Sequence, residues 1–322
     1  SVVIIQPWNE TGGDQLKPAQ AAIDALRPQY PPLVMDHAEL IPIHKYWWSL
    51  FENLGLYYDS AAQFGQAVMV DEFGGNYLDG NGDPGSYPTT RETFLRFLGR
   101  HHTAEERLQL QADSNARVAE YWRRLGVAGF SPFAILGSHE DGNHWYLGPT
   151  NVPSPKPKPV WAALSAAFAR QSLSLEIWNR NFAPGEAVSM PLWFFNEGDQ
   201  DQVMAASLHI VNIDGTDAML PLRFRMALKA HTSATMPITV PLPSKAGEWR
   251  IEARLTDPFP ATPVVSAWTI RTLTPQPSAR LKTIAIGVSE DEVELRAFLH
   301  GMNLRVVAPA DTSARVVLGS RA

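Results

Sequence analysis

The chain has no cysteine among its 322 residues. This absence excludes disulfide bridges, thiolate metal sites and cysteine nucleophiles. No apolar run approaches the roughly 18 residues that a membrane-spanning helix needs, and no signal-peptide pattern begins at Ser1. Neither absence fixes the compartment, although an exported location, periplasmic or extracellular, is slightly favoured. A chain that begins in mid-strand without methionine is expected to be the downstream part of a longer protein.

Positive charge is also scarce. The chain has 27 lysine and arginine residues against 33 aspartate and glutamate residues, which gives a net charge of −6. No basic stripe is present that could release counterions from phosphate groups, so nucleic acid is not expected as a partner. A homo-oligomer remains open.

Two stretches read as buried strands that end on acidic residues. The first is residues 2–5, four consecutive β-branched residues, and it leads to Asn9 and Glu10. The second is residues 67–70, which leads to Asp71 and Glu72. Because buried parallel strands present their carboxyl ends at one edge of a sheet, the two glutamates are expected to face one substrate.

Strands alternate with helices in the first half of the chain. Residues 32–36 and 41–48 are expected to contain short strands, and residues 126–130 one more. Thr103 and Glu106 have the spacing of a capping box that opens an amphipathic helix. This alternation is typical of parallel βα units.

A proline-rich linker at residues 153–159 leads into a helix over residues 160–168. Beyond it the hydrophobic period changes from about 3.6 to 2. About seven such strands within about 100 residues predict a β-sandwich of immunoglobulin type. We therefore expect residues 1–168 to be the C-terminal half of a (β/α)8 catalytic barrel, and residues 169–276 to be the sandwich.

The last segment, residues 277–322, is expected to be the start of an α/β, Rossmann-like domain that the sequence cuts off. Residues 284–288 read as a buried strand, and Ser289 and Glu292 have capping spacing for a helix that ends at Gly301. Further strands are expected at residues 305–307 and 315–318. The first strand lacks a glycine fingerprint, so a dinucleotide site is not expected.

Glu10 and Glu72 are the strongest candidates for chemistry. Retaining cleavage of a glycosidic bond needs one carboxylic acid to protonate the leaving oxygen and one carboxylate to attack the anomeric carbon, about 5–5.5 Å apart. Strand ends on opposite sides of a parallel barrel can provide this separation. The alternative for either residue alone is a solvated glutamate at a strand end.

The order of these motifs resembles the clan A glycoside hydrolases. Residues 1–10, which end in Trp-Asn-Glu, look like the fourth barrel strand of that clan, and His44-x-Tyr46 looks like the sixth. Residues 70–74, Val-Asp-Glu-Phe-Gly, look like the seventh strand. The predicted sandwich, entered through residues 158–164, is most similar to glycoside hydrolase family 2. The resemblance covers roughly residues 1–275.

The resemblance implies a retaining β-glycosidase that works by double displacement without a cofactor. It implies that Glu10 is the general acid/base and that Glu72 is the nucleophile. Asn9 would hydrogen-bond the sugar 2-hydroxyl, Tyr46 would orient Glu72, and His44 would line the same subsite. The substrate would be a carbohydrate.

Aromatic rings suit sugar recognition because the apolar faces of a pyranose stack on them. Trp8 and Trp145 are therefore candidate walls of the sugar site, as are Trp47 and Trp48, although at least one of the latter pair is expected in the core. One departure from the family concerns the eighth strand, which usually ends near a tryptophan. Here residues 130–133 read Phe-Ser-Pro-Phe, which puts the floor of the sugar site in doubt.

No metal site is expected. Residues 79–83 imitate the first ligands of a calcium loop, but Pro84 stands where glycine is needed and Thr90 where glutamate is needed. A glycine-rich turn is the preferred interpretation. Residues 139–144 contain two histidines and two acidic residues, yet their spacing matches no zinc pattern.

A rival hypothesis from another class is a non-catalytic carbohydrate-binding or scaffold protein that kept the glycosidase fold. The altered eighth strand is the feature that favours it. A barrel without its first strands would also expose sheet edges, so the chain by itself is expected to have little or no activity.

Overall fold

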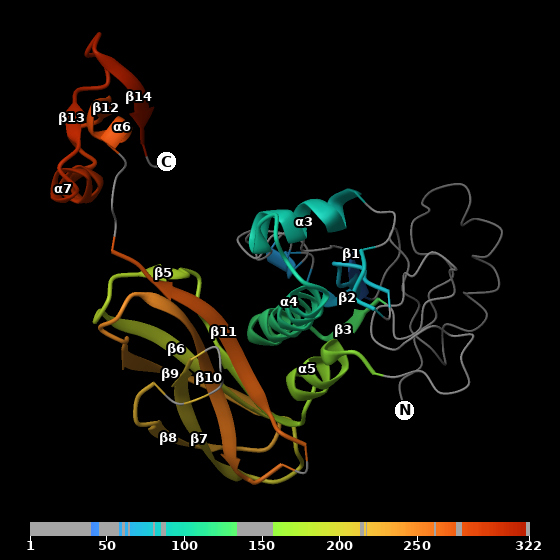
Figure 1. Cartoon of the computed structure of the whole chain (residues 1–322). Helices are drawn as coiled ribbons and strands as arrows, with labels where there is room; N and C mark the ends of the chain where they lie inside the picture. The colour runs from blue at the N-terminus through green and yellow to red at the C-terminus, as the bar shows by residue number, and fades with distance from the viewer. Residues whose placement is uncertain are drawn as a thin grey trace. The chain divides into compact units, whose positions relative to one another are not determined.

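The computed structural model describes residues 40–44, 58–59, 62–63, 65–79, 81–84, 88–133, 157–212, 216, 218–260, 262–274 and 279–319 (Figure 1). It is a mixed α/β protein with a strand-rich middle portion. Two compact units are present. The first comprises residues 1–180, 187–241 and 248–270, and the second residues 181–186, 242–247 and 271–322. No helix in the described part of the chain is long and apolar enough to span a bilayer.

The first unit begins with a parallel three-stranded sheet. Its strands, in spatial order, are β1 (Leu40–His44), β2 (Ala67–Phe73) and β3 (Gly129–Pro132). Its helices are α3 (Pro88–Leu98), α4 (Ala104–Leu125) and α5 (Pro159–Ala167). The predicted parallel βα arrangement is therefore confirmed for these strands.

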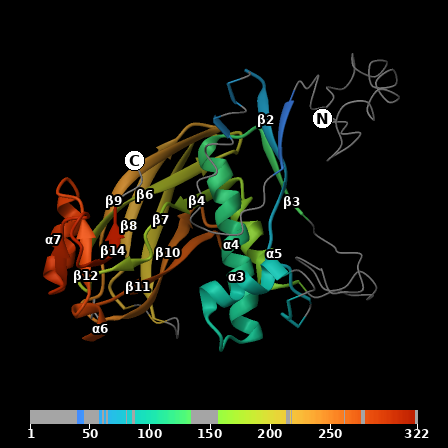
Figure 2. The ribbon, with the colours of Figure 1, turned by 90° about the horizontal axis from the view of Figure 1, so that it is seen from above.

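The helices α4 and α5 cover one face of this sheet (Figure 2). Val68, Val70 and Phe73 of β2 are buried in one cluster with Trp122 of α4 and Val160 of α5. Burying apolar side chains between a sheet and its helices is the main stabilisation of such a layer.

The start of α4 agrees with the sequence. The Thr103 hydroxyl accepts a hydrogen bond from the backbone N–H of Glu106 at 3.2 Å, and the Thr103 N–H donates to the Glu106 carboxylate at 2.7 Å. Both bonds of the predicted capping box are present. The helix ends where Gly126 takes a left-handed conformation with φ of 70°.

The middle portion contains two sheets. One consists of β4 (Gln171–Leu175), β6 (Ala187–Asn196) and β9 (Thr232–Pro241), in that order and antiparallel. The other has the order β5 (Asn181–Phe182), β11 (Val265–Thr272), β10 (Gly247–Asp257), β7 (Gln202–Val211) and β8 (Leu222–Leu228). Alternate residues are buried along β6 and β10, as the period of 2 predicted.

The second unit contains a parallel sheet in which β12 (Ala285–Val288) lies between β13 (Arg305–Val307) and β14 (Ala314–Leu318). The short α6 (Ala279–Lys282) precedes this sheet, and α7 (Val293–Gly301) follows β12. The prediction that Ser289 caps this helix is wrong. The N-cap of α7 is Glu292, and it makes no side-chain capping bond. The Glu292 N–H donates to the Ser289 carbonyl, so residues 289–292 form a turn and the helix begins after it.

Candidate active site

A break in the alternation of β2 places two carboxylates on the same face. Val70 and Phe73 are three residues apart, yet both are buried in the core beneath the helices. Strict alternation would put them on opposite faces. The pairing of β2 with both of its neighbours shifts by one residue in this interval, as in a β-bulge. Asp71 and Glu72 therefore both lie on the face opposite the helical core.

His44 lies beside both carboxylates. Its Nδ1 atom is 3.6 Å from Asp71 Oδ1 and 3.5 Å from Glu72 Oε2. The side chain of Asp71 is 3% exposed and that of Glu72 is 13% exposed. The imidazole comes from the end of β1, which pairs with β2 at this point. Glu72 thus lies close to an imidazole and has limited access to solvent.

The chain after Glu72 is held in place by α4. Gly74 and Gly75 have φ of 133° and 144°, values that favour glycine, and Asn76 follows with φ of 59°. The Gln111 side chain donates to the Asn76 carbonyl at 2.9 Å, and the Asn76 side chain donates to Ser114 Oγ at 3.0 Å. These bonds satisfy a buried stretch of backbone. They also fix the direction in which the chain leaves the candidate site.

The structure places only part of the predicted site. His44 lies beside Glu72. The other predicted site residues lie outside the described residues: Trp8, Asn9, Glu10, Tyr46 and Trp145. Asp71 was not predicted to contribute, and its only signal in the sequence was its place next to Glu72.

Two phenylalanines lie on and just after β3. The Phe130 ring belongs to the helical core, where it lies 4.8 Å from the Phe168 ring and 6.1 Å from the Phe73 ring. Phe133, just after β3, is 48% exposed, and its N–H donates to the Phe73 carbonyl. Phe133 thus offers an exposed ring just after β3.

Residues 79–84 form a turn. Asp79 Oδ1 accepts hydrogen bonds from the N–H groups of Asn81 and Asp83, both at 2.8 Å. Asp83 also pairs with Arg107 of α4 at 2.8 Å. These carboxylates are used by the turn itself, as a glycine-rich turn predicts. Within the described residues, no group of three or more histidine or acidic side chains could hold a metal ion.

Lys158 is a buried cation that the sequence analysis did not identify. It is 6% exposed, it precedes α5, and its ammonium group donates to the Leu78 carbonyl. Burial lowers its pKa from 10.5 to about 8, although the nearby carboxylate of Asp79 opposes this shift. The side chain ties the turn after β2 to the start of α5.

This pKa predicts a pH-dependent stability. Between pH 8 and pH 10.5 the unfolded chain holds the Lys158 proton and the folded chain has released it, so the free energy of unfolding rises with pH. Relative to Lys158→Met, the natural protein should gain up to about 3 kcal/mol across this interval. Chemical denaturation of both proteins at several pH values measures the difference. A difference that does not change between pH 8 and pH 10.5 would contradict the assignment.

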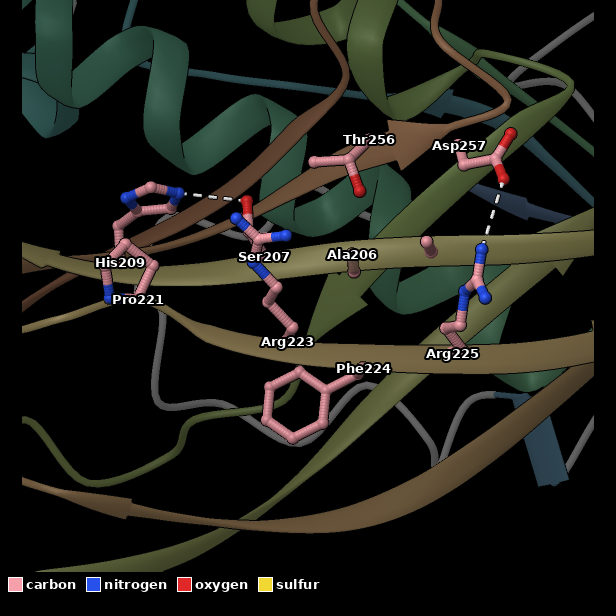
Figure 3. Close-up of a pocket in the computed structure, with 10 residues that line it drawn as sticks. Ala206, Ser207, His209, Pro221, Arg223, Phe224, Arg225, Thr256 and Asp257 are labelled. Atoms are coloured by element: carbon pink, nitrogen blue, oxygen red, sulfur yellow. Dashed lines mark hydrogen bonds and ion pairs between the residues drawn. The ribbon is translucent and has the colours of Figure 1, made fainter.

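A separate hollow lies on the five-stranded sheet, where β7, β8 and β10 run side by side (Figure 3). Its volume is about 730 Å³. Ser207, His209, Arg223, Arg225 and Asp257 are among the residues that line it, whereas His44 and Glu72, the predicted site residues that the structure describes, do not. It is therefore distinct from the carboxylate cluster on β2.

Neither a protein-family model nor a curated protein matches the chain. Similar solved structures include a family 123 glycoside hydrolase from Clostridium perfringens, with a TM-score of 0.26 and 10% identity over 37% of this chain and 30% of that chain. A β-glucosidase from Listeria innocua has a TM-score of 0.26 and 12% identity over 33% and 16% of the two chains. E. coli α-2-macroglobulin has a TM-score of 0.26 and 18% identity over 34% of this chain and 7% of that chain. The matches span less than a third of each of these structures, and likenesses this low carry no argument about function.

Proposed function

We propose that the protein is a retaining glycoside hydrolase that acts on a β-linked sugar, with Glu72 as the nucleophile. The observation that carries the proposal is the position of Glu72, at the carboxyl end of the middle strand of a parallel sheet and opposite the helical core. Open α/β sheets and barrels place their reactive groups at this edge. His44, 3.5 Å away, would hold the carboxylate in position.

The remaining roles are those implied by the family resemblance. Glu10 would be the general acid/base, Asn9 would bind the sugar 2-hydroxyl, and Tyr46 would orient Glu72. Trp8 and Trp145 would form walls of the sugar site, and Phe133 would supply the ring that the eighth strand otherwise lacks. The parallel sheet would belong to a (β/α)8 barrel, and the two sheets that follow would be an immunoglobulin-like domain as in family 2.

The reaction would consist of two displacements. In the first, a Glu72 oxygen bonds to the anomeric carbon while Glu10 gives its proton to the departing glycosidic oxygen. In the second, Glu10 takes a proton from water, the hydroxide oxygen attacks the anomeric carbon, and the ester bond to Glu72 breaks. The sugar leaves with its original anomeric configuration, and both carboxyl groups return to their starting state.

Trapping the intermediate tests the proposal. An activated 2-deoxy-2-fluoro β-glycoside should inactivate the full-length protein and add the mass of one fluorosugar to the peptide that carries Glu72. A label on another residue would contradict the assignment of Glu72. Saturable binding of the glycoside without any mass gain would favour the non-catalytic alternative.

Azide distinguishes the roles of the two glutamates by stereochemistry. With Glu10→Ala, azide should attack the sugar ester of Glu72 and give a β-glycosyl azide, which retains the configuration. With Glu72→Ala, azide should take the place of the missing carboxylate and give the α-azide. Nuclear magnetic resonance identifies the product. Azides of the same configuration from both variants would contradict the two roles.

A further inference from the structure

The hollow in Figure 3 is lined by small residues of β7, by Arg223 and Arg225 of β8, and by Thr256 and Asp257 of β10. β7 lies between β8 and β10, and its small residues Ala205 and Ser207 line the hollow. Ser207 is paired with Arg223 on β8 and with Arg254 on β10. Small side chains flanked by long ones leave a trough along the strand.

The arginines around this trough differ in their acidic partners. Arg254 donates to Glu252 at 2.6 Å, and Arg225 lies 3.8 Å from Asp257. No acidic side chain in the described part of the chain forms an ion pair with Arg223. Among the described residues, Arg223 is thus the lining arginine without an acidic partner, and it stands opposite Ser207 in the strand register.

Polar groups converge on the same point. Ser207 Oγ lies 2.9 Å from His209 Nε2, and Ser207 is only 9% exposed. Figure 3 shows the Arg223 side chain extending from β8 toward Ser207, with His209 close by. A planar guanidinium presents two parallel N–H groups that match the two oxygens of a carboxylate or a sulfate. The bonded pair of Ser207 and His209 adds polar hydrogen-bonding groups beside it.

We propose that this trough binds one oxyanion group, a carboxylate or a sulfate, carried by a saccharide. The oxyanion part rests on Arg223, Ser207 and His209, and the saccharide part rests on the proposed function. The Arg223 guanidinium on a protein of net charge −6 suits one anionic group rather than a polyanion. The site is independent of Glu72 and would hold an acidic sugar without cleaving it.

Titrations of the full-length protein test the proposal. Glucuronate and glucose 6-sulfate represent the two oxyanions, glucose is the neutral control, and acetate and inorganic sulfate are the controls without a sugar. We expect saturable binding of one or both acidic sugars, little binding of glucose, and affinity at least about 10-fold lower in Arg223→Gln. Arg170→Gln removes another exposed arginine, one that does not line the trough, so binding should be unchanged.

Several outcomes would overturn the proposal. Absence of saturable binding for both acidic sugars, or equal affinity in Arg223→Gln and the natural protein, would remove the oxyanion site. Acetate or inorganic sulfate that bound as tightly as the matching sugar would remove the saccharide part. The titrations should give the same result in Glu72→Gln, so a failure of the glycosidase proposal is read separately, from the trapping experiment.

Discussion

Replacing Glu72 with glutamine is expected to abolish turnover. An amide oxygen cannot form the sugar ester, so the first displacement has no nucleophile, while the shape of the side chain is retained. Removing a covalent nucleophile lowers kcat by about 10⁴-fold or more in well-studied enzymes. Initial rates on an activated aryl β-glycoside, which needs little acid assistance, measure this step directly.

Asp71→Asn is the matched control for this variant. It removes one carboxylate charge from the same bulge and from the same histidine, since His44 Nδ1 is 3.6 Å from Asp71 and 3.5 Å from Glu72. A positioning role predicts a much smaller loss for Asp71→Asn than for Glu72→Gln. Near-normal rates for Glu72→Gln, or equal losses for both variants, would contradict the role of Glu72.

Replacing Arg117 with alanine is expected to destabilise the first unit by about 3 kcal/mol or more. Arg117 is 3% exposed, and it donates to the Ala267 carbonyl from two nitrogens at 3.1 Å and 2.9 Å. Its guanidinium also lies 4.3 Å from the centre of the Trp268 ring and pairs with Asp113. The substitution removes this contact between α4 and β11, and it leaves buried polar groups without their partner.

Arg96→Ala provides the comparison. Arg96 and Glu92 form an ion pair one helical turn apart in α3, as Arg117 and Asp113 do in α4, but both of its side chains are well exposed. Surface pairs of this kind contribute less than about 1 kcal/mol. Denaturant unfolding of both variants should therefore separate them clearly. Similar losses of stability in the two variants would show that α4 is not buried against β11.

Local signals explain what the sequence predicted well. The capping box at Thr103, the period of 2 along β6 and β10, and the parallel strands of the second unit all depend on residues close together in the chain. The helix α3 was missed, although Pro88 at its first position is a common start signal.

Burial of the polar side of α4 could not be predicted in this way. Asp113, Arg117 and Glu120 follow the spacing of a solvated helix face, yet all three are buried. Ser266 of β11 donates to the Glu120 carboxylate at 2.7 Å, and burial nevertheless raises the pKa of Glu120. The partners lie about 150 residues further along the chain, so no local pattern reveals them.

In the candidate site, too, some features follow from local sequence and others depend on distant partners. The strand that ends at Glu72, and its neighbour that ends at His44, could be predicted from apolar runs followed by polar residues. The bulge that turns Asp71 to the same face depends on pairing with both neighbouring strands. Alternation alone would have put Asp71 and Glu72 on opposite faces.

The distance between the carboxyl groups of Glu10 and Glu72 tests the central claim most directly. An experimental structure of the full-length protein with a bound sugar analogue would measure it. The proposed mechanism predicts a separation of about 5–5.5 Å, with the anomeric carbon between the two groups. Carboxyl groups that are far apart, or that face separate environments, would contradict it.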